Sequence, residues 1–462
     1  MRFIVSSDIR VSGYGLDLLQ YCSENLTVDN PDYIKKEKLG KWLGRTPKKL
    51  YMYKQIGNEL VLPFGCLKYL WDTYKGQATF EPRFKTTSRI DYDSKIKLYD
   101  YQEKAVNMAV QAKNGVVIAP CGAGKTQIGL EIASRIGGRT LWLTHKADLL
   151  EQSMSRAKSV FGLDDSEYGT ITAGKITLGN TMTFATVQTM ANLDLKQFAN
   201  YFTTIIVDEA HHCVGTPTAL TMFYKILSDL SARYKFGLTA SEHRSDGLHK
   251  TMFYIIGEKI VEISRKEVED KTCPVIVNML QSGYEPNMRA IASYDGTFAH
   301  CDLLKDMIEN TARNEFIVNE IKSVQGSVLV LSDRKAHLET LHKMLNEPKS
   351  TIIKALTNSK KVRAEREQVL KDLNNGDLRV VFATYSLAKE GLDVPNLRYV
   401  VLATPQKDKI TVTQSAGRVG RKAENKDCGR VIDILDNFGY LYGYAKKRKS
   451  IYKKLGYTIC EW

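Results

Sequence analysis

Short apolar runs alternate with helix-like stretches along most of the chain, and this alternation predicts its fold class. The runs at residues 115–118, 204–207 and 399–403 are typical of strands buried on both faces of a sheet. Stretches with a helical period, such as residues 127–136, separate them. We therefore expect an α/β protein in which helices cover both faces of parallel sheets.

Other apolar patterns extend this picture along the chain. Residues 327–331 and 379–383 predict further buried strands, and residues 273–277 predict a strand within a connecting segment. Before residue 95, the runs 49–54 and 60–63 flank a turn-like stretch and together predict a β-hairpin. The sequence shows no internal repeat period and no low-complexity tract.

A glycine-rich turn lies between the strand predicted at 115–118 and the helix predicted at 127–136. Its sequence is Ala119-Pro120-Cys121-Gly122-Ala123-Gly124-Lys125-Thr126. Strand, glycine-rich turn and helix are the context of a phosphate-binding loop, where backbone N–H groups and a helix N-terminus cradle phosphate oxygens. We expect Gly122 and Gly124 to line the phosphates. Lys125 would reach the β- and γ-phosphates, and the Thr126 hydroxyl would ligate Mg²⁺.

The tetrad Asp208-Glu209-Ala210-His211 follows the strand predicted at 204–207. An Asp at the carboxyl end of a buried strand can hold the water shell of Mg²⁺, so Asp208 is a second candidate metal ligand. Glu209 is a candidate general base that orients and deprotonates the attacking water, which favours hydrolysis. His211 is a candidate for coupling this site to neighbouring segments. The alternative is a simple helix-capping Asp-Glu pair.

Two arginines alternate with two glycines in a third segment, Gln414-Ser415-Ala416-Gly417-Arg418-Val419-Gly420-Arg421. Guanidinium groups suit phosphate oxygens, so Arg418 and Arg421 are candidate arginine fingers for the γ-phosphoryl transition state. An ordinary basic surface helix is the alternative, but glycines weaken such a helix without an evident structural gain.

In this order, the three segments resemble the motifs of superfamily 2 helicases of the DEAH-lettered type, and among them bacteriophage branch-migration DNA helicases. The resemblance covers about residues 95–440 and includes further motifs in the family's order. It implies that Gln102 reads the adenine base and that Gln414 positions the attacking water. It also implies that Gly391 and Asp393 contribute to nucleotide binding.

The remaining motifs imply coupling and nucleic-acid contacts. Thr239 and Ser241 resemble the segment that links hydrolysis to movement, although Ser241-Glu242 stands where the family has Thr-Pro. That departure concerns the coupling geometry rather than the family assignment. The nucleic-acid contacts implied by the resemblance are His145, Lys146, Thr186, Gln188, Arg334 and Thr384.

The fold implied by the resemblance is two RecA-like parallel-sheet motor domains in tandem with a small N-terminal α+β domain. The expected parts are a DNA-binding domain at 1–94, an ATP-binding motor domain at 95–265, a connection at 266–300, a second motor domain at 301–440 and a basic aromatic segment at 441–462. ATP would bind between the motor domains, with Lys125 and Thr126 on one wall and Arg418 and Arg421 on the other.

The net charge of the chain indicates a polyanionic partner. The formal net charge is +14 and the isoelectric point is near 9.1. The N-terminal part resembles a module of some phage helicases, which implies contact with duplex or junction DNA, and its candidate contacts are Lys41, Trp42, Arg45, Lys48 and Lys49. The alternative for this part is a small domain that braces the first motor domain and has a solvated basic face.

Tyrosines and lysines interleave near the end of the chain, between residues 440 and 454. Such a segment can track a single strand by phosphate contact and base stacking. We favour the other interpretation, a terminal helix that packs its tyrosines on the preceding domain while its lysines face water.

The function we expect is an ATP-dependent DNA helicase or translocase that remodels forks or junctions, with ATP and Mg²⁺ as cofactors. The alternatives are an RNA-stimulated helicase, a restriction-system motor and a non-unwinding ATP-dependent clamp. Expected partners are DNA (RNA in the alternative) and replication or recombination proteins, but no membrane. Because membrane-span, secretory-signal and paired-cysteine patterns are missing, we expect a cytoplasmic protein, in the bacterial host if phage-encoded. Oligomeric state and polarity stay open.

Overall fold

The computed structural model describes residues 1–84, 90–120, 122–216, 221–240, 248–288, 300–353, 360–389, 392, 394–424 and 426–461. The chain forms two compact units, Met1–Ser264 and Arg265–Trp462, called here the first and second unit. The predicted site residues Ser241, Gly391 and Asp393 lie outside the described residues. Within the described ranges, no helix is long and apolar enough to cross a lipid bilayer.

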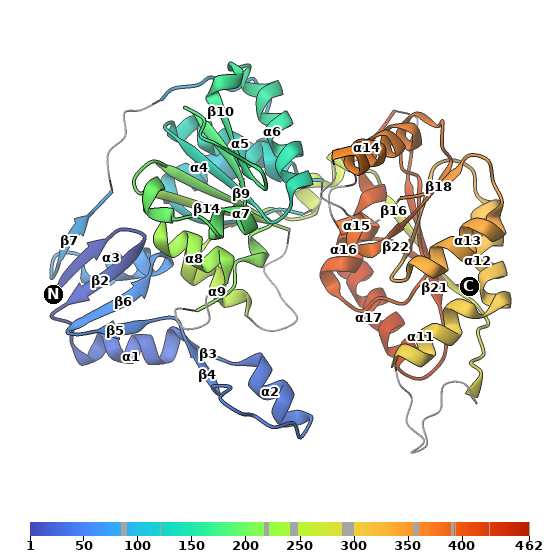
Figure 1. Ribbon diagram of the computed structural model, residues 1–462, viewed down its shortest axis with the longest axis horizontal. Coiled ribbons are helices and arrows are strands. Elements are labelled where there is room, and N and C mark those ends of the chain that lie inside the picture. Colours follow the sequence, from blue (N-terminus) through green and yellow to red (C-terminus); the bar gives the residue numbers. More distant parts are fainter. Residues whose placement is uncertain are drawn as a thin grey trace. The chain divides into compact units, whose positions relative to one another are not determined.

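The first unit begins with a five-stranded sheet of order β5-β6-β2-β1-β7 (Figure 1). Its strands are β1 (Arg2–Val5), β2 (Asp8–Ser12), β5 (Lys54–Ile56), β6 (Glu59–Pro63) and β7 (Thr79–Pro82). Helices α1 (Leu16–Asn25) and α3 (Leu67–Tyr74) belong to the same region. The strands pair antiparallel except for β1 and β7, which run parallel. The predicted N-terminal α+β architecture is confirmed.

The predicted hairpin is confirmed only in its second half. β5 and β6 pair with Ile56 opposite Glu59, around a turn where Gly57 has a φ of 57°. Residues Lys49–Tyr51 instead form β4, which pairs antiparallel with β3 (Thr27–Asp29). The prediction that these residues belong to the hairpin was wrong. The chain stays attached to the segment before β3 beyond the end of β4, because the Met52 side chain is buried and its N–H donates to the Leu26 carbonyl at 2.9 Å.

An eight-stranded sheet of order β11-β10-β12-β9-β13-β14-β8-β15 forms the rest of the first unit. Its strands are β8 (Asn114–Ile118), β9 (Thr140–Thr144), β10 (Tyr168–Thr172), β11 (Lys175–Thr177), β12 (Met182–Thr186), β13 (Thr204–Asp208), β14 (Tyr234–Thr239) and β15 (Lys259–Glu262). Neighbours run parallel except β10 and β11. Its helices are α4 (Asp100–Ala112), α5 (Lys125–Ile136), α6 (Ala147–Phe161), α7 (Val187–Ala191), α8 (Met222–Asp229) and α9 (His249–Ile256).

The second unit is built on a seven-stranded parallel sheet of order β18-β19-β17-β20-β21-β16-β22. Its strands are β16 (Val275–Gln281), β17 (Val328–Ser332), β18 (Ser350–Ile352), β19 (Val380–Thr384), β20 (Tyr399–Leu402), β21 (Gly429–Leu435) and β22 (Thr458–Glu461). Its helices are α11 (His300–Glu309), α12 (Thr311–Ser323), α13 (Lys335–Leu345), α14 (Lys360–Asn375), α15 (Tyr385–Lys389), α16 (Lys409–Gly417) and α17 (Tyr440–Lys454). The apolar runs predicted as strands are confirmed in both units.

Helices on both faces explain why these strands are apolar throughout. In β17, Leu329 and Leu331 belong to a core that includes residues of α14, α15, α16 and α17. Val328 and Val330 belong to the opposite core, with residues of α12 and α13. Consecutive side chains of a strand point to opposite faces, so every position of the strand is buried.

The end of the chain is part of the second unit's fold. Helix α17 buries Ile451 and Tyr452 in the core, and its buried Arg448 lies with Nε 2.8 Å from Oδ2 of Asp433 on β21. β22 then pairs parallel with β16. The interpretation of a packed terminal helix is confirmed, although Tyr442 remains about half exposed.

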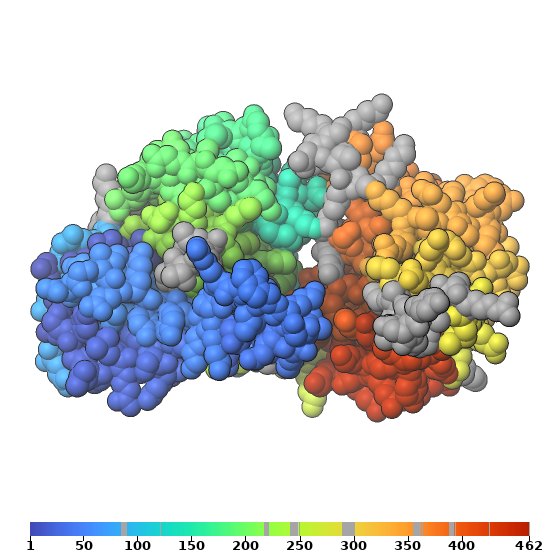
Figure 2. Space-filling view, turned by 60° about the horizontal axis from the view of Figure 1, so that its bottom comes forward, coloured from blue at the N-terminus to red at the C-terminus, as the bar shows by residue number. Residues whose placement is uncertain are grey.

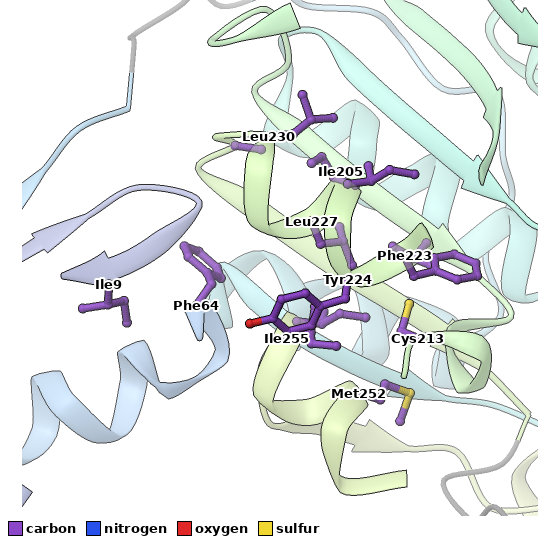
Figure 3. Packing of buried hydrophobic residues seen from close by; sticks show 14 of the residues in the cluster. Ile9, Phe64, Ile205, Cys213, Phe223, Tyr224, Leu227, Leu230, Met252 and Ile255 are labelled. Carbon is purple, nitrogen blue, oxygen red and sulfur yellow. The ribbon is translucent and has the colours of Figure 1, made fainter. Parts of the chain in front are cut away.

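The N-terminal sheet and the first motor sheet share one continuous core, which Figure 3 shows from close by. Ile9 and Phe64 come from the N-terminal sheet region, whereas Tyr224, Leu227 and Ile255 come from helices of the larger sheet. Burial of each such apolar side chain stabilises the folded state by about 1.5–3 kcal/mol. This packing is what the bracing interpretation predicts for the N-terminal part.

A buried lysine side chain connects the N-terminal sheet to the larger sheet. Lys235 of β14 is fully buried, and its Nζ donates to the carbonyls of Ser7 at 3.1 Å and Leu227 at 2.8 Å. The Nζ also lies 4.3 Å from the centroid of the Phe64 ring. Burial lowers the pKa of Lys235 from its ordinary 10.5 to about 7, and the nearby Asp8 carboxylate offsets part of this lowering.

Lys235→Met is expected to flatten the pH dependence of the first unit's stability. Between about pH 7 and 10.5 the unfolded chain binds a proton that folded Lys235 does not, so the free energy of unfolding rises with pH across this window. Urea unfolding of the wild type and the variant at pH 7, 8, 9 and 10 measures this slope. Equal slopes would contradict the assignment, and Lys104→Met, at an exposed lysine of α4, is the control.

Candidate nucleotide site and nucleic-acid face

The phosphate-binding loop has the backbone that the motif requires. It connects β8 to α5, which begins at Lys125. Gly122 and Gly124 have φ values of 88° and 76°, a region that favours glycine. A Cβ on Gly124 would lie 2.4 Å from Nε2 of Gln102, so a larger residue would require that side chain to move in addition to a strained backbone. The first N–H groups of an α-helix have no acceptors within the helix, and at a loop of this kind they can bind phosphate oxygens.

Gln102 packs directly against this loop. Its side chain is 1% exposed; Nε2 donates to the Ala123 carbonyl at 2.8 Å and Oε1 accepts from the Tyr99 N–H at 3.0 Å. The second bond caps the start of α4. Gln102 thus holds the loop against α4, and its contact with adenine stays a prediction.

The acidic pair lies beside the loop lysine. Asp208 is the last residue of β13, and its Oδ1 accepts from the Glu209 N–H at 3.0 Å. Glu209 adopts a left-handed backbone with a φ of 51°, a region in which a residue other than glycine is strained. Its Oε1 lies 3.9 Å from Nζ of Lys125. The structure therefore places Lys125 beside Asp208 and Glu209, the residues predicted to bind phosphate, to hold Mg²⁺ and to activate the attacking water.

The pKa values of Asp208 and Glu209 are shifted in opposite directions. Burial, together with the charge of Glu209, raises the pKa of Asp208 to about 7. Burial alone would raise the pKa of Glu209 as well, but Lys125 and His211 outweigh it and hold that pKa well below its usual range. Glu209 is therefore ionised near pH 7, whereas Asp208 is partly protonated there.

His211 joins this pair to the end of the next strand. Its Nδ1 lies 3.3 Å from Oε2 of Glu209 and 3.1 Å from Oγ1 of Thr239, the last residue of β14. The Thr239 carbonyl accepts from the Ala119 N–H at 2.9 Å, at the start of the phosphate loop. Because β13, β14 and β8 are adjacent and parallel, their carboxyl ends place these residues side by side.

Four of the predicted nucleic-acid residues of the first unit, His145, Lys146, Thr186 and Gln188, lie at or just after the ends of the neighbouring strands β9 and β12. Nε2 of the exposed Gln188 donates to the His145 carbonyl at 2.7 Å. Oγ1 of Thr186 bonds Oγ1 of Thr189 at 3.0 Å. The Lys146 carbonyl accepts from the Thr144 hydroxyl at 2.9 Å. The segments form one face, although the Thr186 side chain is largely buried.

In the second unit, Thr384 is the last residue of β19, and Arg334 lies two residues after the end of the adjacent parallel strand β17. The Arg334 N–H donates to Oγ of Ser332 at 3.1 Å, and Oγ1 of Thr384 lies 2.9 Å from Oγ of Ser386. The two sites therefore lie at the same edge of the sheet, which is where loops carry function in such folds.

Gln414, Arg418 and Arg421 lie on and just after α16. Nη1 of Arg418 donates to the Leu392 carbonyl at 3.0 Å. The backbone of Arg421 forms an antiparallel bridge with Thr272, and its carbonyl accepts from Nζ of Lys426 at 2.9 Å. This local structure excludes an ordinary solvated helix for the segment.

Two family descriptions match two separate stretches of the chain. "Type III restriction enzyme, res subunit" matches residues 95–244, and "Helicase conserved C-terminal domain" matches residues 312–423. The chain belongs to superfamily 2 of the helicases. This helicase is a nucleic-acid-dependent ATPase, and its family uses ATP, typically with Mg²⁺.

Named relatives agree with this assignment. The ATP-dependent DNA helicase uvsW of Enterobacteria phage T4 is 26% identical, over 91% of this helicase and 86% of the relative. The DNA 3'-5' translocase XPB2 of Sulfurisphaera tokodaii is 24% identical, over 77% and 85% respectively. The structure of Saccharomyces cerevisiae Dbp5 bound to RNA and ADP BeF3 has a TM-score of 0.55 at 15% identity, covering 79% of this helicase and 90% of Dbp5. That last likeness concerns the fold alone.

Sequence reasoning missed one residue of the site. The ring of His212 lies with its centroid 4.2 Å from the centroids of both His211 and His145. The available signal was the pair of consecutive histidines after Ala210, but a pattern of letters does not show that His145, far away in the sequence, would complete the stack.

Proposed function

We propose that this helicase is an ATP-dependent DNA helicase or translocase that remodels branched DNA, such as forks or junctions. The observation that carries its motor activity is the cluster of Lys125, Glu209, His211 and Thr239 at one edge of the first unit's sheet. This cluster brings the phosphate-binding loop, the proposed general base and the proposed coupling strand together through an ion pair, a His211–Glu209 contact and a hydrogen bond between His211 and Thr239. The similarity to a phage DNA helicase supports the choice of DNA.

The residues present fit ATP with Mg²⁺. The carboxyls of Asp208 and Glu209 lie beside the Lys125 ammonium, and carboxylate oxygens suit a divalent cation, whose charge would favour the ionised form of Asp208. Asp208 and the Thr126 hydroxyl, on the first turn of α5, would hold the cation. When bound, the cation neutralises charge on the β- and γ-phosphates.

The chain's own groups would then complete hydrolysis. Lys125 binds the phosphates, and the ionised Glu209 takes the proton of the attacking water. Arg418 and Arg421, aided by Gln414, would come from the second unit and stabilise charge on the γ-phosphoryl group. Hydrolysis in this proposal requires the two units to close, which links each turnover to movement on nucleic acid.

A basic arm supports branched DNA as the substrate. It consists of β3, β4 and α2 (Pro31–Lys38), and Figure 1 shows it extending from the five-stranded sheet. Helix α2 buries none of its residues. Lys41, Arg45 and Lys48 are exposed, and Trp42 is 88% exposed. In Figure 2 the arm is part of the blue surface of the first unit.

The shape of the arm is held internally rather than by the core. Asn30 caps α2 by accepting from the Asp32 N–H, and its Nδ2 donates to the Pro47 carbonyl at 2.8 Å. Nζ of Lys36 donates to Oγ1 of Thr46 at 2.6 Å. A preformed projection with cations and a bare indole suits phosphates and an unstacked base, both of which are present at a DNA branch point.

The triple variant Lys41→Ala/Arg45→Ala/Lys48→Ala is expected to lose the preference for branched DNA. Removing three phosphate contacts should reduce the salt slope of junction binding by about three and spare tailed duplexes. Binding and ATP-driven strand displacement are measured on a four-way junction and on a tailed duplex from 50 to 200 mM salt.

The matched control removes the same charge at exposed sites outside the arm, with Lys104→Ala/Lys175→Ala/Lys322→Ala. Equal losses on both substrates, or in both triple variants, would reject the arm as the branch-recognition element. A preference of the wild type for an RNA duplex would favour the RNA-stimulated alternative.

A further inference from the structure

Three histidine rings form a contiguous stack between the nucleotide site and the nucleic-acid face of the first unit. His211 and His212 lie in the 3₁₀ turn Ala210–His212 after β13, whereas His145 lies between β9 and α6. The ring planes of His211 and His212 are inclined by 39°, and those of His212 and His145 by 44°, with centroids 4.2 Å apart in each pair. Two segments that are distant in the sequence therefore touch through the ring of His212.

Each end of the stack is fastened to a functional group. At one end, Nδ1 of His211 contacts Oε2 of Glu209 and Oγ1 of Thr239. At the other end, the His145 carbonyl accepts from Nε2 of the exposed Gln188. A path of contacts therefore leads from Glu209 through the three rings to Gln188, which bonds the backbone of His145.

The surroundings of His145 favour packing over a contact with phosphate. Its ring is largely buried, and burial together with Lys146 lowers its pKa to about 4, so the ring is neutral near pH 7. Nδ1 of His145 has no hydrogen-bond partner within the described part of the chain. A buried nitrogen without a partner costs free energy, and this ring therefore gains stability when a shift brings it a partner.

We propose that His212 is a positioning residue that couples nucleotide state to nucleic-acid binding by transmitting ring displacements between His211 and His145. The inference rests on the nucleic-acid-dependent ATPase activity of the family and not on a preference for branched DNA. Coupling between two sites is reciprocal: nucleic acid changes the affinity for nucleotide by the same factor by which nucleotide changes the affinity for nucleic acid.

The test measures that factor in the full-length protein. Affinity for a non-hydrolysable ATP analogue is titrated with and without oligo(dT), and affinity for oligo(dT) with and without the analogue; oligo(U) replaces oligo(dT) in a parallel set. His212→Ala is expected to reduce the coupling factor about fivefold or more. His212→Phe keeps a ring in the stack and is expected to restore most of the coupling.

The control and the overturning results are specific. His342→Ala removes a ring that packs on Phe382 in the second unit, with centroids 5.4 Å apart, and should leave the coupling factor unchanged. A wild-type factor in folded His212→Ala would overturn the proposal, and so would equal losses in the Ala and Phe variants. If neither oligonucleotide changes wild-type affinity for the analogue, the nucleic-acid dependence itself fails, a result distinct from a failure of His212 alone.

Discussion

Lys125→Ala is expected to reduce ATP turnover by at least about 10²–10³-fold, the effect of removing one group that stabilises developing charge. Lys125 begins α5 at the phosphate loop, and its Nζ lies 3.9 Å from Glu209. The substitution removes the cation expected at the γ-phosphate. The substitution also removes the charge that lowers the pKa of Glu209 most, and it leaves the effect of burial, which raises that pKa. The proposed general base is then already protonated at a higher pH than in the wild type.

The measurement is steady-state phosphate release at saturating ATP and oligo(dT), accompanied by thermal unfolding to confirm the fold. Lys175→Ala, at an exposed lysine of β11, is the matched control and should keep wild-type turnover. Retained turnover in Lys125→Ala would show that the phosphate-binding loop is not part of the ATPase site and would reject the proposed chemistry.

Arg421→Ala is expected to impair hydrolysis by about 10³-fold or more while ATP still binds, as for the loss of an arginine finger. The backbone of Arg421 is fixed independently of its side chain, because it forms a bridge with Thr272 and its carbonyl accepts from Lys426. Truncation should therefore remove the guanidinium without unfolding the segment. Nη1 of Arg418 donates to the Leu392 carbonyl, so truncation of Arg418 would also remove a bond within the second unit.

Binding and turnover are separated by titrating a fluorescent ATP analogue and measuring phosphate release on the same preparation. Lys422→Ala is the neighbouring control, because Nζ of Lys422 already donates to the Asp270 carbonyl. Normal turnover in Arg421→Ala would reject the finger role. A parallel loss of analogue binding would instead assign Arg421 to ground-state binding.

Local patterns predicted much of the fold because their information is local. The strand at 204–207 is β13 and the helix at 127–136 lies within α5, since apolar runs and helical periods report burial directly. The turn chemistry was equally readable: Gly122 and Gly124 hold the positive φ values that the phosphate loop requires. Grouping of Lys125 with Glu209 followed from the rule that carboxyl ends of parallel strands meet at one edge.

Pairings between distant segments were not readable in the same way. Nothing in residues 49–51 states that their partner is Thr27–Asp29 rather than the following strand, and register is set by long-range packing. The burial of Lys235 and the contact of His212 with His145 are of the same kind, because each depends on which elements become neighbours. A polar residue in an apolar strand was the available hint for Lys235.

The most direct test of the account is strand displacement by the wild type on a four-way DNA junction, a forked DNA, tailed duplexes of both polarities and an RNA duplex. Each is incubated at one low salt concentration with ATP, without ATP, and with Lys125→Ala protein. The account predicts ATP-dependent loss of the junction or fork ahead of the tailed duplexes, and no loss with Lys125→Ala. Hydrolysis of ATP without displacement of any DNA strand would contradict it and favour the non-unwinding clamp.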